Sequence, residues 1–467
     1  MVSRAQIISL LSLALLAACE KPDSTPTTKA TGPQPSEERA APPAKKVKKP
    51  EGPKKPKRKT KKQLDAERKT FAAELKQLDT DIIGIEKLIK AAPDNRMNHE
   101  RLAATHMQHA RLTGSYDDYA LAEASVATAF EHEPRTSALL LRAKLHYSLH
   151  RLPQARADFE AAKPTIRPTP DGVASREAFE ANLAMQAGDS AKAEKHFDAS
   201  LASKRTTSSL SSVAVYRWKT GDFEQAEALF REALKSYHGK PMEPRAWLHL
   251  NLGLLDLDRG RYDDALAHYR EAETFMKGYW LIDEHIAEIL TLQGKTEEAK
   301  TLYLDILERT QNPEFMDAMA GIAFEAGDSD EGKRWVEKAQ ERYEEQTAKY
   351  PEAAYGHALG HYLEFGDDPA FALELARKNY DLRPNLDASI MLAQAHLKAG
   401  DARAAEKALK NILKSKFKSA ELFVTAAEVH HALRHSKKAS TWLEKARAID
   451  PTSKLESTQQ AASDQNP

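Results

Sequence analysis

The strongest constraint on the fold of this 467-residue chain is a repeat with a period of 33 to 39 residues. The repeat is marked first by residues that suit a tight turn, most of them glycines. Five residues after most turn positions comes a small residue, and nine residues after many of them comes a bulky one. The turn positions are Gly114, His150, Gly188, Gly221, Gly260, Gly294, Gly327, Gly366, Gly400 and Arg434. A period of this length indicates one supersecondary unit stacked many times.

Each unit is typical of two amphipathic helices joined by a turn. Glycine accepts the positive φ of the turn, the small residue lets two helices approach, and the bulky residue fills the space between pairs. The clearest unit is RAWLHLNLGLLDLDRGRYDDALAHYREAE, residues 245–273, with Leu252-Gly253, Gly260, Ala265 and Tyr269 as its signature. This unit resembles the tetratricopeptide repeat (TPR). The resemblance implies an all-α, TPR-type α-solenoid, a superhelix of about nine to ten helix pairs over residues 95–451, preceded by an N-terminal disordered tether.

Three features depart from the family pattern. The first unit has extra residues between Gly114 and Ala122. Trp247 lies two positions earlier than the tryptophan of the family's first helix. Gly366 is followed by an insertion around Pro369, so the turn of that unit is longer than the others.

The first 18 residues resemble the signal peptide of a bacterial lipoprotein. Arg4 supplies a positive charge, and residues 7–16 form an apolar run that is shorter than the roughly 20 residues of a membrane-spanning helix. The run ends in Leu16-Ala17-Ala18-Cys19, which is similar to a lipobox, and Cys19 is the single cysteine of the chain. The resemblance implies cleavage before Cys19, lipidation of its thiol and a place at the cell envelope, with Glu20 favouring the periplasmic face of the outer membrane. The alternative is a plain secretory signal that happens to have a cysteine near its cleavage site.

A linker of residues 19–62 follows, with nine prolines and with eleven lysines and arginines between Lys45 and Lys62. Such a segment buries too little apolar surface to fold, and its like charges extend it, so we expect a disordered tether. The same charges suit peptidoglycan carboxylates or anionic lipid. Nucleic acid is not an expected partner, because no aromatic residue lies among the lysines to stack on bases. Residues 63–467 carry ten more acidic than basic residues, so a basic linker precedes an acidic body.

Two further segments flank the repeats. Residues 63–94 are expected to form a helix that either caps the first repeat or pairs as a coiled coil. Its heptad-spaced apolar residues are Phe71, Leu75, Leu78, Ile82, Ile85 and Ile89. Residues 452–467 are polar, and we expect a disordered tail there.

In the TPR family, four positions of the first helix of each unit line a concave groove that binds partners. Transferred to this chain, these positions predict an apolar patch beside an acidic one, suited to an extended or helical peptide with basic residues. The predicted groove residues are Trp218, Leu250, Leu254, Leu257, Glu284, Glu288, Asp317, Phe324, His357, His361, Gln394, Glu428 and His431.

Signs of catalysis or metal binding are weak. His357 and His361 share one helix face and could chelate zinc as a pair, but a zinc site needs at least a third protein ligand. The sequence contains no HExxH motif, no phosphate-binding loop, no GxSxG motif and no dinucleotide-binding glycine pattern. We therefore expect no catalytic residue, no metal and no cofactor, and a protein that is not an enzyme.

Together these features predict a lipid-anchored scaffold or adaptor at the bacterial cell envelope, which binds protein or peptide partners in its groove. The alternative is an envelope-organising structural protein whose basic linker, Lys45 to Lys62, binds peptidoglycan or anionic lipid. An enzyme or a metal protein is the least favoured class. The partner itself is not encoded in any motif of the sequence.

Overall fold

The computed structural model describes residues 70–132, 135–239 and 241–455. Within these ranges the chain forms α-helices and two short 3-10 helices, and it contains no strand. The all-α solenoid expected from the repeats is therefore confirmed. None of the described helices combines the length and the apolar character that crossing a membrane requires. The predictions for residues 1–18, for Cys19 and for the linker up to residue 62 lie outside the described residues.

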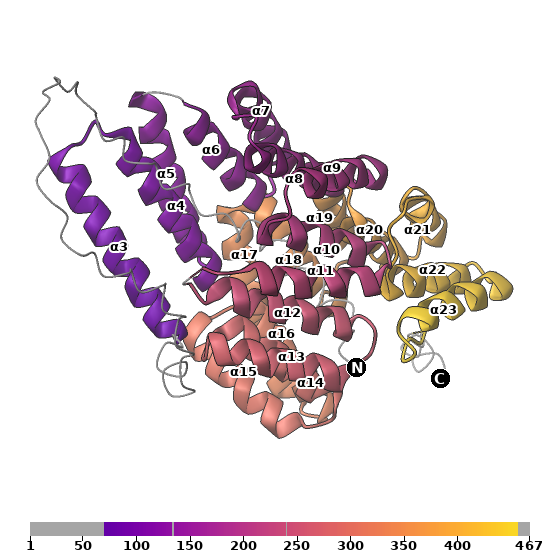
Figure 1. Ribbon diagram of the computed structural model, residues 1–467. Coiled ribbons are helices and arrows are strands. Elements are labelled where there is room, and N and C mark those ends of the chain that lie inside the picture. The colour runs from indigo at the N-terminus through magenta and orange to yellow at the C-terminus, as the bar shows by residue number, and fades with distance from the viewer. Residues whose placement is uncertain (1–69, 133–134, 240, 456–467) are drawn as a thin grey trace, which may run out of the picture. The chain divides into compact units, whose positions relative to one another are not determined.

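Within the part of the chain that the structure describes, ten consecutive helix pairs make up the array, and the partners of each pair pack against each other (Figure 1). The pairs are α4 (Arg96–Thr113) with α5 (Tyr116–His132), α6 (Thr136–Ser148) with α7 (Leu152–Ala162), α8 (Pro170–Gln186) with α9 (Ser190–Ser203), α10 (Thr207–Lys219) with α11 (Phe223–Ser236), α12 (Glu243–Leu257) with α13 (Tyr262–Phe275), α14 (Trp280–Leu292) with α15 (Thr296–Thr310), α16 (Pro313–Glu325) with α17 (Ser329–Lys349), α18 (Pro351–Glu364) with α19 (Pro369–Leu382), α20 (Leu386–Lys398) with α21 (Ala402–Leu409), and α22 (Ala420–Ala432) with α23 (Ser436–Ile449). The 3-10 helices η1 (Lys163–Thr165) and η2 (Ile412–Lys414) follow α7 and α21.

A Gly-Asp dipeptide forms four of the turns inside the pairs. The glycine has a φ between 73° and 81°, and the aspartate after it is the N-cap residue of the second helix. For example, the Asp189 carboxylate accepts a hydrogen bond from the backbone N–H of Lys192 at 2.9 Å. One dipeptide thus turns the chain and satisfies an N–H at the start of the next helix. The dipeptides are Gly188-Asp189, Gly221-Asp222, Gly327-Asp328 and Gly400-Asp401.

The two turn positions without a glycine follow the same geometry, whereas one turn position with a glycine does not. His150 and Arg434 both have a φ of 59°, which confirms that they occupy glycine-like turn positions. Gly366 is not among the residues with positive φ. There the insertion lengthens the turn, and Asp368 caps α19 by accepting hydrogen bonds from the N–H groups of Ala370 and Phe371 at 2.9 and 3.0 Å.

Small and bulky residues alternate in the core as the repeat predicts. Ala265 and Tyr269 are fully buried. A Cβ atom added at Gly253 of α12 would lie 2.2 Å from Cε1 of Tyr269, so only glycine leaves room for that ring. The corresponding rings of other units, Phe159, Phe197, Phe230 and Tyr303, are at most 1% exposed.

The helix before the first pair is α3 (Phe71–Ala91), and it packs against α4. Its start is fixed by the backbone hydrogen bond from Phe71 N to Lys277 O (3.1 Å) and by the stacking of Phe71 on Tyr279 (5.0 Å between ring centroids). Leu78 and Ile85 are buried. These are the contacts that a capping helix requires.

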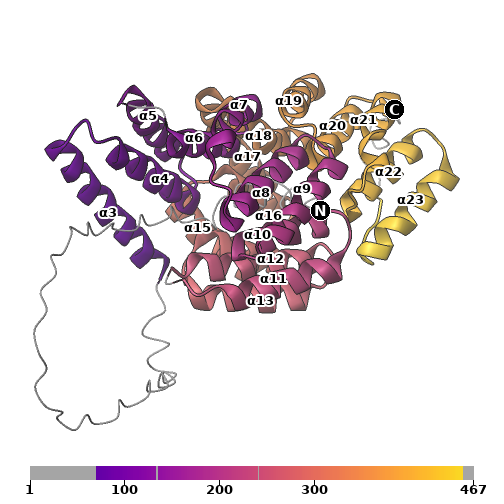
Figure 2. The same cartoon turned by 45° about the horizontal axis from the view of Figure 1, so that its top comes forward.

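Helix pairs far apart in the sequence also touch. The indole N–H of Trp280 donates to the carbonyl of Leu112 at 2.7 Å. The side-chain amide of Asn385 donates to that of Gln186 at 2.8 Å. In both orientations α20 lies beside α8 and α10 (Figures 1 and 2). The superhelix therefore packs against itself, with pairs from its second half lying against pairs from its first half.

The end of the described chain takes part in this packing as well. A Cβ atom at Gly260 would lie 2.3 Å from Oδ1 of Asp450. Arg447 Nε donates to the carbonyl of Ser453 at 3.0 Å. The tail predicted to be disordered from residue 452 thus begins with residues that are held in place, and residues 456–467 lie outside the described residues.

Candidate functional site

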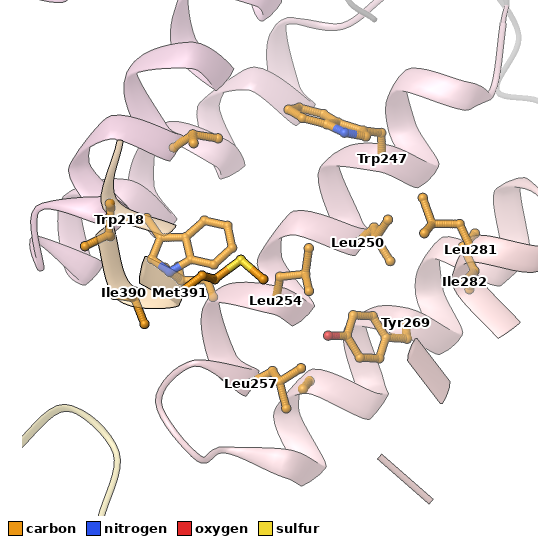
Figure 3. Close-up of a cluster of buried hydrophobic side chains, with 14 of the residues drawn as sticks. Trp218, Trp247, Leu250, Leu254, Leu257, Tyr269, Leu281, Ile282, Ile390 and Met391 are labelled. Atoms are coloured by element: carbon orange, nitrogen blue, oxygen red, sulfur yellow. The ribbon is translucent and has the colours of Figure 1, made fainter. Parts of the chain in front are cut away.

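The apolar half of the predicted groove is buried. Trp218, Leu250, Leu254 and Leu257 are each at most 2% exposed. Figure 3 shows Trp218 and Leu254 facing Ile390 and Met391 of α20. These two residues of α20 are also almost fully buried, at 0% and 4% exposure. The chain's own α20 therefore covers Trp218 and Leu254, and a ligand could reach these two residues only by displacing it.

Polar contacts hold this covered wall in place. The indole N–H of Trp218 donates to Oδ2 of Asp258 at 2.6 Å. Burial raises the pKa of Asp258, although the nearby Lys219 ammonium opposes the shift. Burial likewise raises the pKa of Glu421 to about 8, with Asp387 adding to the rise. Sequence reasoning did not single out Asp258, Asp387 or Glu421, because they come together only when α10, α12, α20 and α22 meet.

The acidic half of the predicted groove is divided between two environments. The first is in α14, where Glu284 and Glu288 are 0% and 2% exposed and His285 is 1% exposed. His285 Nδ1 lies 3.1 Å from Glu284 Oε2 and 3.2 Å from Glu288 Oε2. Burial raises the pKa of Glu284 well above its ordinary range, and the carboxylates of Glu288 and Glu314 add to the rise. His285 was not among the residues predicted from sequence, because it lies one position outside the expected groove register.

The second environment lies between α16 and α18. Asp317 accepts a hydrogen bond from the Tyr343 hydroxyl at 2.9 Å and lies 2.7 Å from Nδ1 of His361. Burial raises the pKa of Asp317, and His361 opposes the rise. His357 Nδ1 contacts Glu314 one helical turn away. The two histidines therefore each pair with a carboxylate of α16 through Nδ1, which explains their spacing without a shared zinc ion.

Among the predicted groove residues, Phe324 is accessible, with 37% of its surface exposed at the end of α16. It packs against Phe365 (6.1 Å between centroids), and Phe371, also 37% exposed, packs against Tyr362 (4.8 Å). Four exposed acidic residues belong to the same two turns. We call this set the aromatic–acidic surface: Phe324, Phe365, Phe371, Glu325, Asp328, Asp367 and Asp368. The insertion after Gly366 supplies Asp367 and Asp368 of this surface. This departure from the repeat is the feature of the sequence that points to the surface.

The remaining predicted groove residues lie toward the C-terminal end. Gln394 is half-buried and its amide lies 3.5 Å from the Thr425 hydroxyl. Glu428 is half-buried and His431 is exposed on α22. No comparison tests partner binding at any of the groove positions, so binding there stays a prediction.

Comparison with known proteins gives two matches to family models, both described as tetratricopeptide repeat, over residues 205–277 and 390–454. No curated protein matches the chain. Similar solved structures include a tetratricopeptide repeat protein from Parabacteroides merdae (18% identity, 52% of this chain and 93% of that chain, TM-score 0.31). Yeast Tom70 is also similar (13% identity, 81% of this chain and 87% of that chain, TM-score 0.41). So is the human IFIT1 dimer with m7Gppp-AAAA (15% identity, 76% of this chain and 90% of that chain, TM-score 0.41).

Proposed function

Because this chain is a tetratricopeptide-repeat protein, we propose that it is a protein-binding scaffold, held at the bacterial cell envelope by a lipid on Cys19. The observation that carries the proposal is the aromatic–acidic surface. Exposed aromatic side chains are a recurrent feature of protein interfaces, because they bury a large apolar area at little cost in conformational entropy. We further propose that this scaffold has no catalytic role of its own.

The chemistry of the surface defines the partner. Phe324 and Phe371 offer apolar contact area, and Asp367 and Asp368 place negative charge beside it. Residues 63–467 as a whole carry ten more acidic than basic residues, which favours the approach of a cation. The partner we propose is therefore a peptide segment in which lysines or arginines alternate with apolar side chains. This agrees in charge with the partner expected from the sequence, but it moves the contact away from the buried Trp218 wall.

A pair of synthetic peptides tests this surface. One alternates lysine with phenylalanine, and the other has glutamate in place of lysine. We expect the full chain to bind the basic peptide, and the double substitution Phe324→Ala, Phe371→Ala to weaken binding at least about tenfold, or about 1.4 kcal/mol. Asp367→Lys should weaken it too. The measurement is isothermal titration calorimetry at two salt concentrations, because higher salt should weaken an interaction between opposite charges.

The matched control for this experiment is Leu304→Ala. Leu304 is 44% exposed on α15, away from the aromatic–acidic surface, so its loss should leave peptide binding unchanged. Equal binding of the basic and acidic peptides would contradict the proposal. So would equal binding of the basic peptide by the wild-type chain and the Phe324, Phe371 double variant.

The proposed location at the cell envelope rests on the resemblance of residues 16–19 to a lipobox. Each buried CH₂ of a lipid contributes about 0.8 kcal/mol, so a protein with two or three acyl chains should partition into detergent. We expect the wild-type chain from a bacterial host in the detergent phase and Cys19→Ser in the aqueous phase. Mass spectrometry of the mature N-terminus is the second measurement.

Deletion of residues 45–62 is the control for the Cys19 experiment, because it keeps the cysteine and removes eleven basic residues. This variant should still enter the detergent phase and still bind the basic peptide. Retention on isolated peptidoglycan is a separate measurement. If the wild-type chain is retained and the deletion variant is not, the linker itself binds the envelope, as in the envelope-organising alternative. A wild-type chain in the aqueous phase with an unmodified Cys19 would refute the lipid anchor.

A further inference from the structure

We propose that Glu284, His285 and Glu288 of α14 form a binding site for one divalent transition-metal cation, with Zn²⁺ as the first candidate. Each of these residues offers one ligand atom, and the three atoms lie within 4.8 Å of one another. One imidazole nitrogen and two carboxylate oxygens are a donor set that suits zinc. This inference is independent of the proposed partner surface, which lies on other residues.

Burial and missing hydrogen bonds provide a second line of evidence. Glu284 is 0% exposed, and within the described residues neither of its carboxylate oxygens accepts a hydrogen bond. Burying a carboxylate without a hydrogen bond is costly, because the group loses its hydration without a replacement. His285 Nδ1 lies 3.1 Å from Glu284 Oε2, but it is a charged partner only when it is protonated. A metal ion is a partner that would satisfy those oxygens. The neighbouring acidic residue Asp317, by contrast, already has Tyr343 and His361 as partners.

Charge balance favours a dication over a proton alone. Two carboxylates with a neutral imidazole carry two negative charges, which one M²⁺ neutralises. A single proton, either on His285 or on Glu284, whose pKa is raised by burial, would neutralise only one of the two. Two other groups near the cluster supply no positive charge. Tyr269 of α13 stacks on His285 with 5.3 Å between ring centroids, and Glu314 of α16 acts on Glu284 as a further negative charge.

Tyr269 also has an unsatisfied group beside the cluster. It is fully buried, and its hydroxyl has no hydrogen-bond partner within the described residues. Burial raises its pKa, and Glu288 and Glu284 raise it further, so the hydroxyl lies in their negative field. All three proposed ligands come from one helix, so the cation would not cross-link helices. Its role would be to neutralise charge where α14 packs against α13 and α15.

The experiment uses the untagged full chain. We expect stoichiometric metal in the protein as purified, measured by inductively coupled plasma mass spectrometry. After treatment with a chelator, added Zn²⁺ should raise the thermal unfolding midpoint, because a ligand that binds only the folded state stabilises it. His285→Gln and Glu288→Gln should each abolish both the bound metal and the shift. Glu298→Gln, an exposed glutamate of α15, is the matched control and should keep both.

X-ray absorption at the zinc edge gives a readout that needs no variant. The proposed site predicts one imidazole ligand and otherwise oxygen ligands. Two or more imidazoles would place the metal at a histidine pair elsewhere and overturn the proposal. Absence of stoichiometric metal together with an unchanged unfolding midpoint on Zn²⁺ addition would overturn it too, as would equal zinc binding by wild type and the His285 variant.

Discussion

Replacing Trp218 with alanine is expected to lower the free energy of unfolding by about 3–5 kcal/mol, the range for a large aromatic removed from a well-packed core. Trp218 is 1% exposed and packs against Ile390 and Met391 of α20 (Figure 3). The substitution would leave a cavity where two distant parts of the superhelix meet. It would also leave the Asp258 carboxylate without the indole N–H that now donates to it at 2.6 Å.

Urea denaturation followed by circular dichroism would measure this loss. Trp442→Ala is the matched control, because Trp442 on α23 is half-buried and stacks at 5.6 Å on Phe423 of α22, within its own helix pair. Its substitution should lower the free energy of unfolding by clearly less than Trp218→Ala does. If Trp218→Ala cost no more than Trp442→Ala, the wall formed by Trp218 would be open in solution, as the sequence-based groove prediction requires.

Replacing Glu284 with glutamine is expected to stabilise the metal-free protein relative to the wild type as pH rises above about 4.5, because glutamine cannot ionise. The difference should grow by about 1.4 kcal/mol for each pH unit until the folded-state pKa of Glu284 is reached. Burial raises the pKa of Glu284 in the folded state well above its value of 4.5 in a model peptide. The folded state therefore binds this proton more tightly than the unfolded state does. The stability that the proton contributes is complete below about pH 4.5 and is lost as pH rises through the folded-state pKa.

The test compares unfolding free energies of the wild-type chain and Glu284→Gln from pH 4 to pH 9 with a chelator present. The difference should be smallest at the acidic end and should grow in favour of the variant as pH rises. Glu298→Gln, which changes an exposed glutamate, should run parallel to the wild type. A constant difference between Glu284→Gln and the wild type at all pH values would show that Glu284 does not titrate differently in the folded and unfolded states.

The repeat could be predicted from sequence because its demands are local. A turn inside a helix pair needs one residue with positive φ, whatever its identity, and His150 and Arg434 adopt it without being glycines. Gly253 and Tyr269 fit together within one unit, and their spacing therefore recurs along the chain. Gly366 departs from the rule for an equally local reason, which is the insertion that ends at the Asp368 cap.

The site could be predicted only in part. Phe324 was chosen from its position in the unit, and it is exposed. Trp218, Leu250 and Leu254 were chosen by the same rule, and they are buried. The rule says which side chains of one unit point to the inner wall of the superhelix. It could not say whether another part of the chain covers that wall, and the grouping of His285 with Glu284 and Glu288 likewise depends on what packs around α14.

The sequence by itself determined that the chain is a stack of helix pairs, how many pairs there are to within one, and where each turn lies. The tertiary structure decided which inner walls meet, and so which of the predicted groove residues are core and which are surface. The reason is geometric: the contacts inside a pair are set by a few neighbouring side chains, whereas α20 reaches Trp218 through small rotations between successive pairs that add up over several units. No single motif encodes that sum, so it is visible only in the folded chain.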